Sequence, residues 1–311
     1  MKSAALLLLL AWLPSAAVAA DRPDWAFPPP QKDPNAPADH DDGLPKHVPG
    51  SARAFTQAQI DDRMNPPDWF PDEHPLLPQV VAHGNGTTVR ACMGCHLATG
   101  HGHPENSRLP GTTTSYLVRQ LADFRSGARR GEGAGAMITI AKGMTEDEIK
   151  SSTEYFAGLK PFRWTRVVEA DTVPKTYFKG TRRLQFPEGT EPIGHRIIEV
   201  PEDVERVESR DPHSGFVSYV PVGSLARGEA LVTAGGGKTI ACAICHGPGL
   251  KGLGEVPDIA GRSPGNIARQ IYYFQTGERG GTSAALMKGV VEKLTGDDMI
   301  AIAAYVASLE P

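Results

Sequence analysis

The chain contains the pattern Cys-x-x-Cys-His twice, at residues 92–96 and 242–246, which lie 150 positions apart. Two thiols three positions apart with an imidazole directly behind them suit covalent attachment of haem, because all three groups then lie on one short helical turn. Four cysteines in an exported chain could instead form two disulfides or act as redox dithiols. The sequence around the two motifs favours haem attachment.

The chain contains an internal duplication, because shifting it by 150 residues aligns the two copies without a gap over about 70 residues. A copy of this size is small for a self-sufficient hydrophobic core, and a buried haem would supplement it. Two motifs at equivalent repeat positions therefore favour haem over disulfides. The identical pairs outside the motifs include Gly102/Gly252, Gly111/Gly261, Arg119/Arg269, Gln120/Gln270, Phe124/Phe274, Gly127/Gly277, Arg129/Arg279, Met137/Met287, Asp147/Asp297, Tyr155/Tyr305 and Pro161/Pro311.

The repeats are predicted to be helical. Residues 116–124 carry apolar side chains at helical spacing, and Gly127 marks the end of that helix. Thr145 to Glu148 is a capping box that starts another helix, which closes at Pro161. The same signal recurs in copy two from Thr295 to Asp298. The predicted fold class is therefore mainly α.

The N-terminus has the pattern of a cleaved secretory signal peptide over residues 1–20. A basic Lys2 precedes a short apolar run and several alanines, and the run is shorter than the ~20 residues that a membrane-spanning helix needs. No later stretch is apolar enough to serve as a transmembrane anchor. The formal charge of −4 gives no basic field for nucleic acid. These features predict an exported, periplasmic protein.

The rest of the chain divides into four predicted parts. Residues 21–75 are rich in proline and acidic residues and are expected to lie extended on a surface or to be loosely tethered. We call them the extension. Module 1 is residues 76–161, and module 2 is residues 224–311. The connector, residues 162–223, combines β-like stretches at 195–200 and 215–220 with turns, and it is expected to pack between or across the modules.

The distal ligand decides what a haem does, because a methionine sulfur opposite the histidine fills the iron's coordination sphere and suits electron transfer. Met137 lies 41 residues after His96, and Met287 lies 41 residues after His246. These equal offsets predict that both methionines bind iron.

Three other residues near the first motif are potential rivals as ligands. Met144 stands directly before a capping box, and its equivalent in copy two is Leu294, which indicates apolar packing. His101 and His103 are predicted to be loop residues, because copy two has no histidine at either position.

The order of Cys-x-x-Cys-His, residues 257–261, residues 267–279, Met287 and a final helix containing Tyr305 resembles class I cytochromes c. The tandem arrangement is similar to dihaem cytochrome c4 and cytochrome c553-type proteins. The resemblance implies two tandem class I cytochrome c domains, with a Pro-rich N-terminal extension and an irregular, partly β connector. It also implies two c-type haems that are bound covalently through thioethers at Cys92, Cys95, Cys242 and Cys245. Their iron would be held by proximal His96 and His246 and by distal Met137 and Met287.

In this family a proline carbonyl orients the proximal histidine. Pro257 matches that proline in copy two, whereas copy one has Ser107. The resemblance therefore predicts a differently held imidazole at the first haem.

The predicted function is that of a periplasmic electron carrier with no catalytic residues. It would pass single electrons between a donor dehydrogenase and an acceptor, either an oxidase or another cytochrome. One alternative is a dihaem peroxidase-type enzyme, which needs two unlike haems and is disfavoured by the near-equal copies. A thiosulfate dehydrogenase would need a cysteine as distal ligand, and all four cysteines are already used as thioethers. A third alternative is a fixed electron-accepting subunit of a periplasmic dehydrogenase complex, with residues 21–75 or 162–223 as docking elements.

Overall fold

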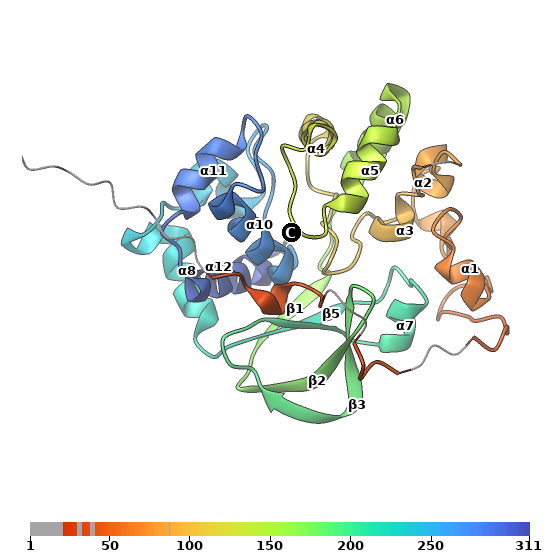
Figure 1. Ribbon diagram of the computed structural model, residues 1–311, viewed down its shortest axis with the longest axis horizontal. Helices are drawn as coiled ribbons and strands as arrows, with labels where there is room; N and C mark the ends of the chain where they lie inside the picture. The colour runs from red at the N-terminus through yellow and green to blue at the C-terminus, as the bar shows by residue number, and fades with distance from the viewer. Residues whose placement is uncertain (1–20, 30–32, 38–40, 87) are drawn as a thin grey trace, which may run out of the picture.

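The computed structural model describes residues 21–29, 33–37, 41–86 and 88–311, so the predicted signal peptide lies outside the described residues. Two groups of helices stand side by side above a β region (Figure 1). No helix in the described ranges combines the length and apolar character needed to cross a membrane.

The helices of module 1 form the first group. They are α2 (Gln79–His83), α3 (Met93–His96), α4 (Thr114–Ser126), α5 (Gly135–Gly143) and α6 (Glu146–Gly158). The predicted helix at 116–124 is confirmed as α4, which packs against α5 and α6. Its apolar face meets a core made by Val80, Val81, Val89, Ala91, Met93, Ala98, Leu117, Met144, Ile149, Tyr155 and Phe156.

Module 2 repeats this arrangement and adds a longer first helix. Its helices are α8 (Ser224–Ala234), α9 (Ala243–His246), α10 (Pro264–Thr276), α11 (Ala284–Val291) and α12 (Gly296–Ser308). Helix α8 crosses α12 closely because Gly228 has no side chain. A Cβ atom at this position would collide with the Ala301 carbonyl. Two short 3₁₀ turns, η3 (Gly235–Gly237) and η4 (Pro248–Leu250), flank α9. The core consists of Leu231, Val232, Leu250, Ala260, Ile271, Phe274, Val291, Leu294, Met299, Ala301, Ile302 and Val306.

Helix boundaries follow the local sequence signals. The Thr145 nitrogen donates to the Glu148 carboxylate at 2.8 Å, and the Glu148 nitrogen donates back to the Thr145 hydroxyl at 3.2 Å, which confirms the capping box at α6. Thr295 and Asp298 make the same pair of bonds at α12. Gly127 ends α4 with φ of 75°, a left-handed conformation that glycine adopts without strain.

The connector forms a small β region below the helices (Figure 1). Strands β1 (Thr165–Glu169), β5 (Phe216–Val220) and β4 (Ile198–Pro201) make one sheet in that order, with β1 parallel and β4 antiparallel to β5. Strands β2 (Thr172–Lys179) and β3 (Arg182–Pro192) pair as an antiparallel hairpin. Two of the five strands, β4 and β5, were predicted from the sequence. The connector also contains a short helix, α7 (Val204–Glu208).

Loose tethering of the extension is wrong for residues 41–75. They contain helix α1 (Gln57–Asp61) and the 3₁₀ turn η2 (Pro71–Glu73), and another 3₁₀ turn, η1 (Asp24–Ala26), lies nearer the N-terminus. The Trp69 indole nitrogen donates to the Ser209 carbonyl at 2.7 Å, which ties the extension to the connector. A separate apolar cluster holds the segment together: Val48, Ile60, Trp69 and Phe70, with Phe55 packed against them.

Candidate haem sites

Each Cys-x-x-Cys-His motif forms one helical turn. The first cysteine is the N-cap of its turn, and the histidine is its last residue. The His96 nitrogen donates to the Cys92 carbonyl at 2.9 Å, and His246 donates to Cys242 at the same distance. All four cysteines are free thiols, so the disulfide alternative is wrong in this structure. Two thiols and an imidazole share each turn, as covalent haem attachment requires.

Both motif histidines are held through Nδ1 by a backbone carbonyl. His96 Nδ1 lies 3.0 Å from the Ser107 oxygen, and His246 Nδ1 lies 2.8 Å from the Pro257 oxygen. Because a carbonyl only accepts, Nδ1 carries the proton, and the lone pair of a neutral ring is on Nε2. The prediction of a differently held first imidazole is wrong, since the backbone supplies this bond whatever the side chain at position 107.

The protonation of these histidines suits iron binding. Burial lowers the pKa of His96 to about 4 and also lowers the pKa of His246, so both rings are neutral at neutral pH. Within the described residues, neither Nε2 atom has a hydrogen-bond partner. A neutral imidazole with a free Nε2 and an anchored Nδ1 is the usual form of a metal-binding histidine.

The three potential rival ligands, Met144, His101 and His103, make other contacts in the structure. Met144 is buried in the core of module 1, as its equivalent Leu294 is in module 2, which agrees with apolar packing. His101 accepts a hydrogen bond at Nε2 from the Phe162 nitrogen at 3.1 Å. It therefore ties module 1 to the connector. His103 is buried and lies 3.5 Å from the Glu105 carboxylate.

The predicted distal ligands lie at equivalent places in the two modules. Met137 is in α5 and Met287 is in α11, and both side chains are half-buried. Met287 also packs against the core of module 2. Iron ligation by these two sulfur atoms remains a prediction.

The modules meet at a pair of equivalent arginines. Arg129 and Arg279 pair as an antiparallel bridge. The Arg129 guanidinium donates to Gln120 at 2.8 Å and to Gln270 of the other module at 3.1 Å. Arg279 donates to Gln270 at 2.9 Å and to Gln120 at 3.2 Å. Each guanidinium thus reaches across the interface, and the two modules are related by an approximate twofold axis there.

Neither arginine of this pair has a direct ion-pair partner among the described residues, although the Asp123 carboxylate acts on both at longer range. Burial and, to a smaller extent, the nearby Arg279 lower the pKa of Arg129 to about 9. Arg279 also donates to the Tyr116 hydroxyl at 2.7 Å. In the described ranges, no carboxylate lies within ion-pair distance of either guanidinium. Two buried or half-buried cations beside each other need an anion, so the interface suits a ligand with carboxylate groups.

Comparison with known proteins identifies the relatives of this chain. No family model matches it. It is 27% identical over 224 residues to the thiosulfate dehydrogenase electron acceptor of Thiomonas intermedia, covering 70% of this chain and 78% of that protein. It is 23% identical over 235 residues to cytochrome c4 of Stutzerimonas stutzeri, covering 71% of this chain and 85% of that protein.

The fold resembles that of the thiosulfate dehydrogenase TsdBA from Marichromatium purpuratum, with a TM-score of 0.51 and 27% identity. The match covers 73% of this chain and 38% of that longer chain. The chain is a homologue of dihaem cytochromes c. Its cofactors are two covalently bound c-type haems, and the two motif turns fit them because each presents two free thiols and an anchored, neutral imidazole.

In this dihaem cytochrome homologue the sequence alone does not reveal the interface residues. Arg129/Arg279 and Gln120/Gln270 stand out only as equivalent pairs of the repeat. The signal was their identity in both copies although they lie outside the haem motifs. Only the twofold contact between the modules shows why both copies keep the same residues.

A buried ion-pair cluster joins the two modules of the cytochrome beside the second motif. Asp258 pairs with Arg108 of module 1 and with Arg262 of module 2, the latter at 2.6 Å. The side chains of Asp258 and Arg108 are 6% and 4% exposed. The carboxylate therefore neutralises two cations away from water.

We expect Asp258→Ala to lower the free energy of unfolding by about 3–5 kcal/mol, because it leaves two guanidinium groups buried and unpaired. Urea denaturation of the holoprotein, followed by far-UV circular dichroism, measures the change. The matched control is Glu310→Ala, which breaks an exposed ion pair with Arg163 and should cost at most about 1 kcal/mol. Equal losses in the two variants would contradict this account of the interface.

Proposed function

We propose that this protein is a periplasmic electron carrier that takes single electrons from a dehydrogenase and passes them to an oxidase or another cytochrome. The observation that carries the proposal is the equivalent geometry of the two motif turns, with free thiols and an imidazole anchored through Nδ1 in both. Two like haem sites suit electron transfer, whereas a dihaem peroxidase needs one site that differs from the other.

The chain's own residues have distinct roles in this proposal. Cys92 and Cys95 hold the first haem through thioethers, and Cys242 and Cys245 hold the second. His96 and His246 would bind iron through Nε2, and Met137 and Met287 would supply its other protein ligands. The haem supplies the one-electron couple when bound, and the protein tunes its potential through these ligands and through burial.

The arginine pair provides the positive charge that the haem propionates need. A guanidinium binds a carboxylate strongly when both are removed from water. Arg129 and Arg279 lie against each other at the interface, and each is hydrogen-bonded to both Gln120 and Gln270. We therefore assign Arg129 and Arg279 to the haem propionates, whose charge the two guanidinium groups would neutralise when the haems are bound.

The proposed donor is a thiosulfate dehydrogenase. The support is the similarity of the chain, over 70% of its length, to a protein described as a thiosulfate dehydrogenase electron acceptor, together with its likeness to the TsdBA chain. A fixed electron-accepting subunit and a freely diffusing carrier share this chemistry, and co-purification with the dehydrogenase distinguishes the first from the second. Export to the periplasm rests on the predicted signal peptide.

The test mixes oxidised holoprotein with thiosulfate and a catalytic amount of thiosulfate dehydrogenase. We expect the reduced α-band to develop to the full amplitude that dithionite gives, since both haems accept electrons. Thiosulfate without the dehydrogenase is the control and should leave the spectrum oxidised. Full dithionite reduction without any enzymatic reduction would contradict the proposed donor, and rapid hydrogen peroxide turnover would favour the peroxidase alternative.

A further inference from the structure

The two motif turns differ in their exposure. Between residues 91 and 103 of module 1 no residue is exposed. In module 2 the equivalent segment, residues 241–253, is largely open to solvent, and Ile244 and Leu253 are 66% and 58% exposed. The repeat itself does not explain this difference, because the two turns have the same backbone geometry.

The difference includes the two residues between the cysteines of each motif. The cysteines and the histidine of the motif share one face of the turn, so the two intervening residues point elsewhere. Met93 and Gly94 of module 1 are both buried. Their equivalents, Ala243 and Ile244, are both exposed.

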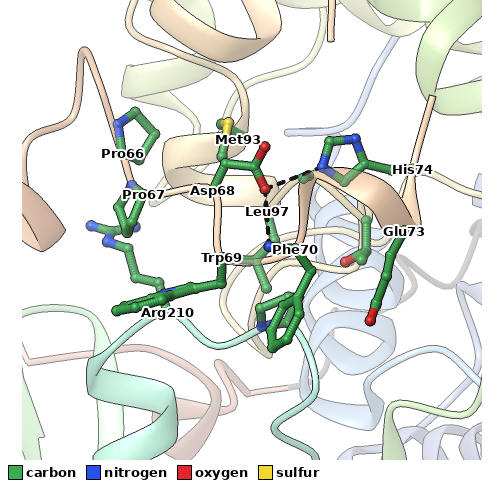
Figure 2. A pocket seen from close by; sticks show the side chains of 13 residues that line it. Pro66, Pro67, Asp68, Trp69, Phe70, Glu73, His74, Met93, Leu97 and Arg210 are labelled. Carbon is green, nitrogen blue, oxygen red and sulfur yellow. Dashed lines mark hydrogen bonds and ion pairs between the residues drawn. The ribbon is translucent and has the colours of Figure 1, made fainter. Parts of the chain in front are cut away.

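The extension covers the outer side of the first turn. The Ala91 nitrogen donates to the Arg63 carbonyl at 3.1 Å. A Cβ atom at Gly94 would lie 3.4 Å from that same carbonyl oxygen, so the extension is already in contact with this position. Figure 2 shows Met93 beside Asp68 and Trp69 of the extension, with Arg210 of the connector closing the same pocket.

Arg210 fastens the extension and the connector onto the turn. Its guanidinium donates to the Gly94 carbonyl and, at 2.7 Å, to the Ile60 carbonyl. Its φ of 58° lies in the left-handed region, which is costly for a residue other than glycine. The contacts of the guanidinium hold the residue in this conformation.

The connector covers the loop that follows the first turn. Leu97 is buried in a cluster with Trp164, Val207 and Phe216. The His101 ring lies 3.7 Å from the Phe162 ring, measured between centroids. Residues 60–70, 162–164 and 207–216 together form what we call the cover.

The exposed segment of module 2, residues 241–253, is apolar and nearly uncharged, and we call it the open face. Between residues 240 and 254 the only charged side chain is that of Lys251, and its Nζ lies 3.1 Å from the Pro311 oxygen. Ile240, Ile244 and Leu253 are exposed in the same segment. An apolar, nearly uncharged surface is complementary to a partner surface of the same kind, because neither side then buries an unpaired charge.

We propose that the cover keeps protein partners away from module 1, so that a one-electron redox protein with an apolar, uncharged face docks on module 2 around Ile244. Electrons then reach the first haem through the second. This inference rests on the proposed function. It adds a direction to that function, since one module exchanges electrons with partners and the other exchanges them only within the molecule.

The test is stopped-flow reduction of the full-length holoprotein by a reduced monohaem cytochrome c. We expect Ile244→Glu to slow the whole absorbance change, from both haems, by about tenfold, because a buried charge opposes docking. The matched control is Leu76→Glu, which places the same charge at a residue that is 96% exposed outside the proposed face. It should leave the rate unchanged.

The amplitude of the slowed phase shows whether both haems receive their electrons through module 2. If Ile244→Glu slows only half of the absorbance change, or none of it, module 1 accepts electrons directly and the inference is overturned. Full reduction by dithionite shows that both haems are present and redox-active. Failure of that reduction contradicts the proposed function itself, so the two failures are distinguishable.

A second variant opens the cover. Arg210→Gly removes the guanidinium, while glycine tolerates the left-handed backbone, so the fold should persist. In the Ile244→Glu background we expect it to restore a fast phase with half the amplitude. Hydrogen–deuterium exchange of residues 60–70 reports release of the cover, and release without a fast phase would overturn the inference.

Discussion

Replacing Met137 by alanine should abolish the far-red sulfur-to-iron band of one haem and make that haem bind carbon monoxide. It should also lower the potential of that haem by on the order of 0.1 V, because a thioether ligand favours reduced iron and axial ligands set haem potentials over about 0.8 V. Optical redox titration and carbon monoxide difference spectra measure these changes. The expectation rests on the equal offsets of Met137 from His96 and of Met287 from His246.

Met144→Leu is the matched control for this prediction. Met144 is buried in the core of module 1, where its equivalent in module 2 is already leucine. A methionine-to-leucine exchange nearly conserves volume, so the band, the potential and the carbon monoxide response should all stay as in the wild type. Loss of the band in Met144→Leu, with Met137→Ala unchanged, would show that the two haem loops differ and that the repeat alignment is misleading at this position.

The second large effect is expected from the double variant Cys242→Ala with Cys245→Ala. Without thioethers the second haem should be lost on acid–acetone extraction, so a pyridine haemochrome assay should give one equivalent per chain, against two for the wild type. Module 2 should also unfold more readily, because a domain of this size depends on its cofactor for part of its core. Thermal denaturation followed by circular dichroism measures that loss.

The control for the cysteine variant is Ile244→Ala, which lies between the two cysteines and is exposed. It changes the same turn without removing a thiol, so two equivalents of haem should remain. Two equivalents in the cysteine double variant, or a single equivalent in the wild type, would contradict the assignment of one covalent haem to each motif.

Much of the repeat could be predicted because its signals are local. The helix of residues 116–124, its end at Gly127 and the capping boxes at Thr145 and Thr295 depend on neighbours within one or two turns, and the structure contains all of them. Local signals failed for three strands of the connector, β1, β2 and β3, which have no clear alternation of apolar residues. Strand β1 forms because β5, far along the chain, supplies its hydrogen bonds, whereas β2 and β3 supply each other's across a short turn.

The orientation of the first imidazole shows where a side-chain argument goes wrong. Ser107 in place of a proline predicted a difference, but a hydrogen bond to a backbone carbonyl requires only the path of the chain. The extension shows the complementary error. Its proline and acidic content predicted a segment that lies extended on a surface or is loosely tethered, and a few apolar side chains, Ile60 and Trp69 among them, exclude loose tethering for residues 41–75.

The sequence by itself determined the cofactor chemistry of this protein, because thioether spacing and the adjacent histidine act within a single turn and the duplication repeats them. Only the tertiary structure decided what surrounds the two haem sites. The paired Arg129 and Arg279 come from different modules, and the cover on module 1 joins residues as distant along the chain as Ile60 and Arg210. Such contacts depend on how the chain folds back on itself, which no local pattern of residues encodes.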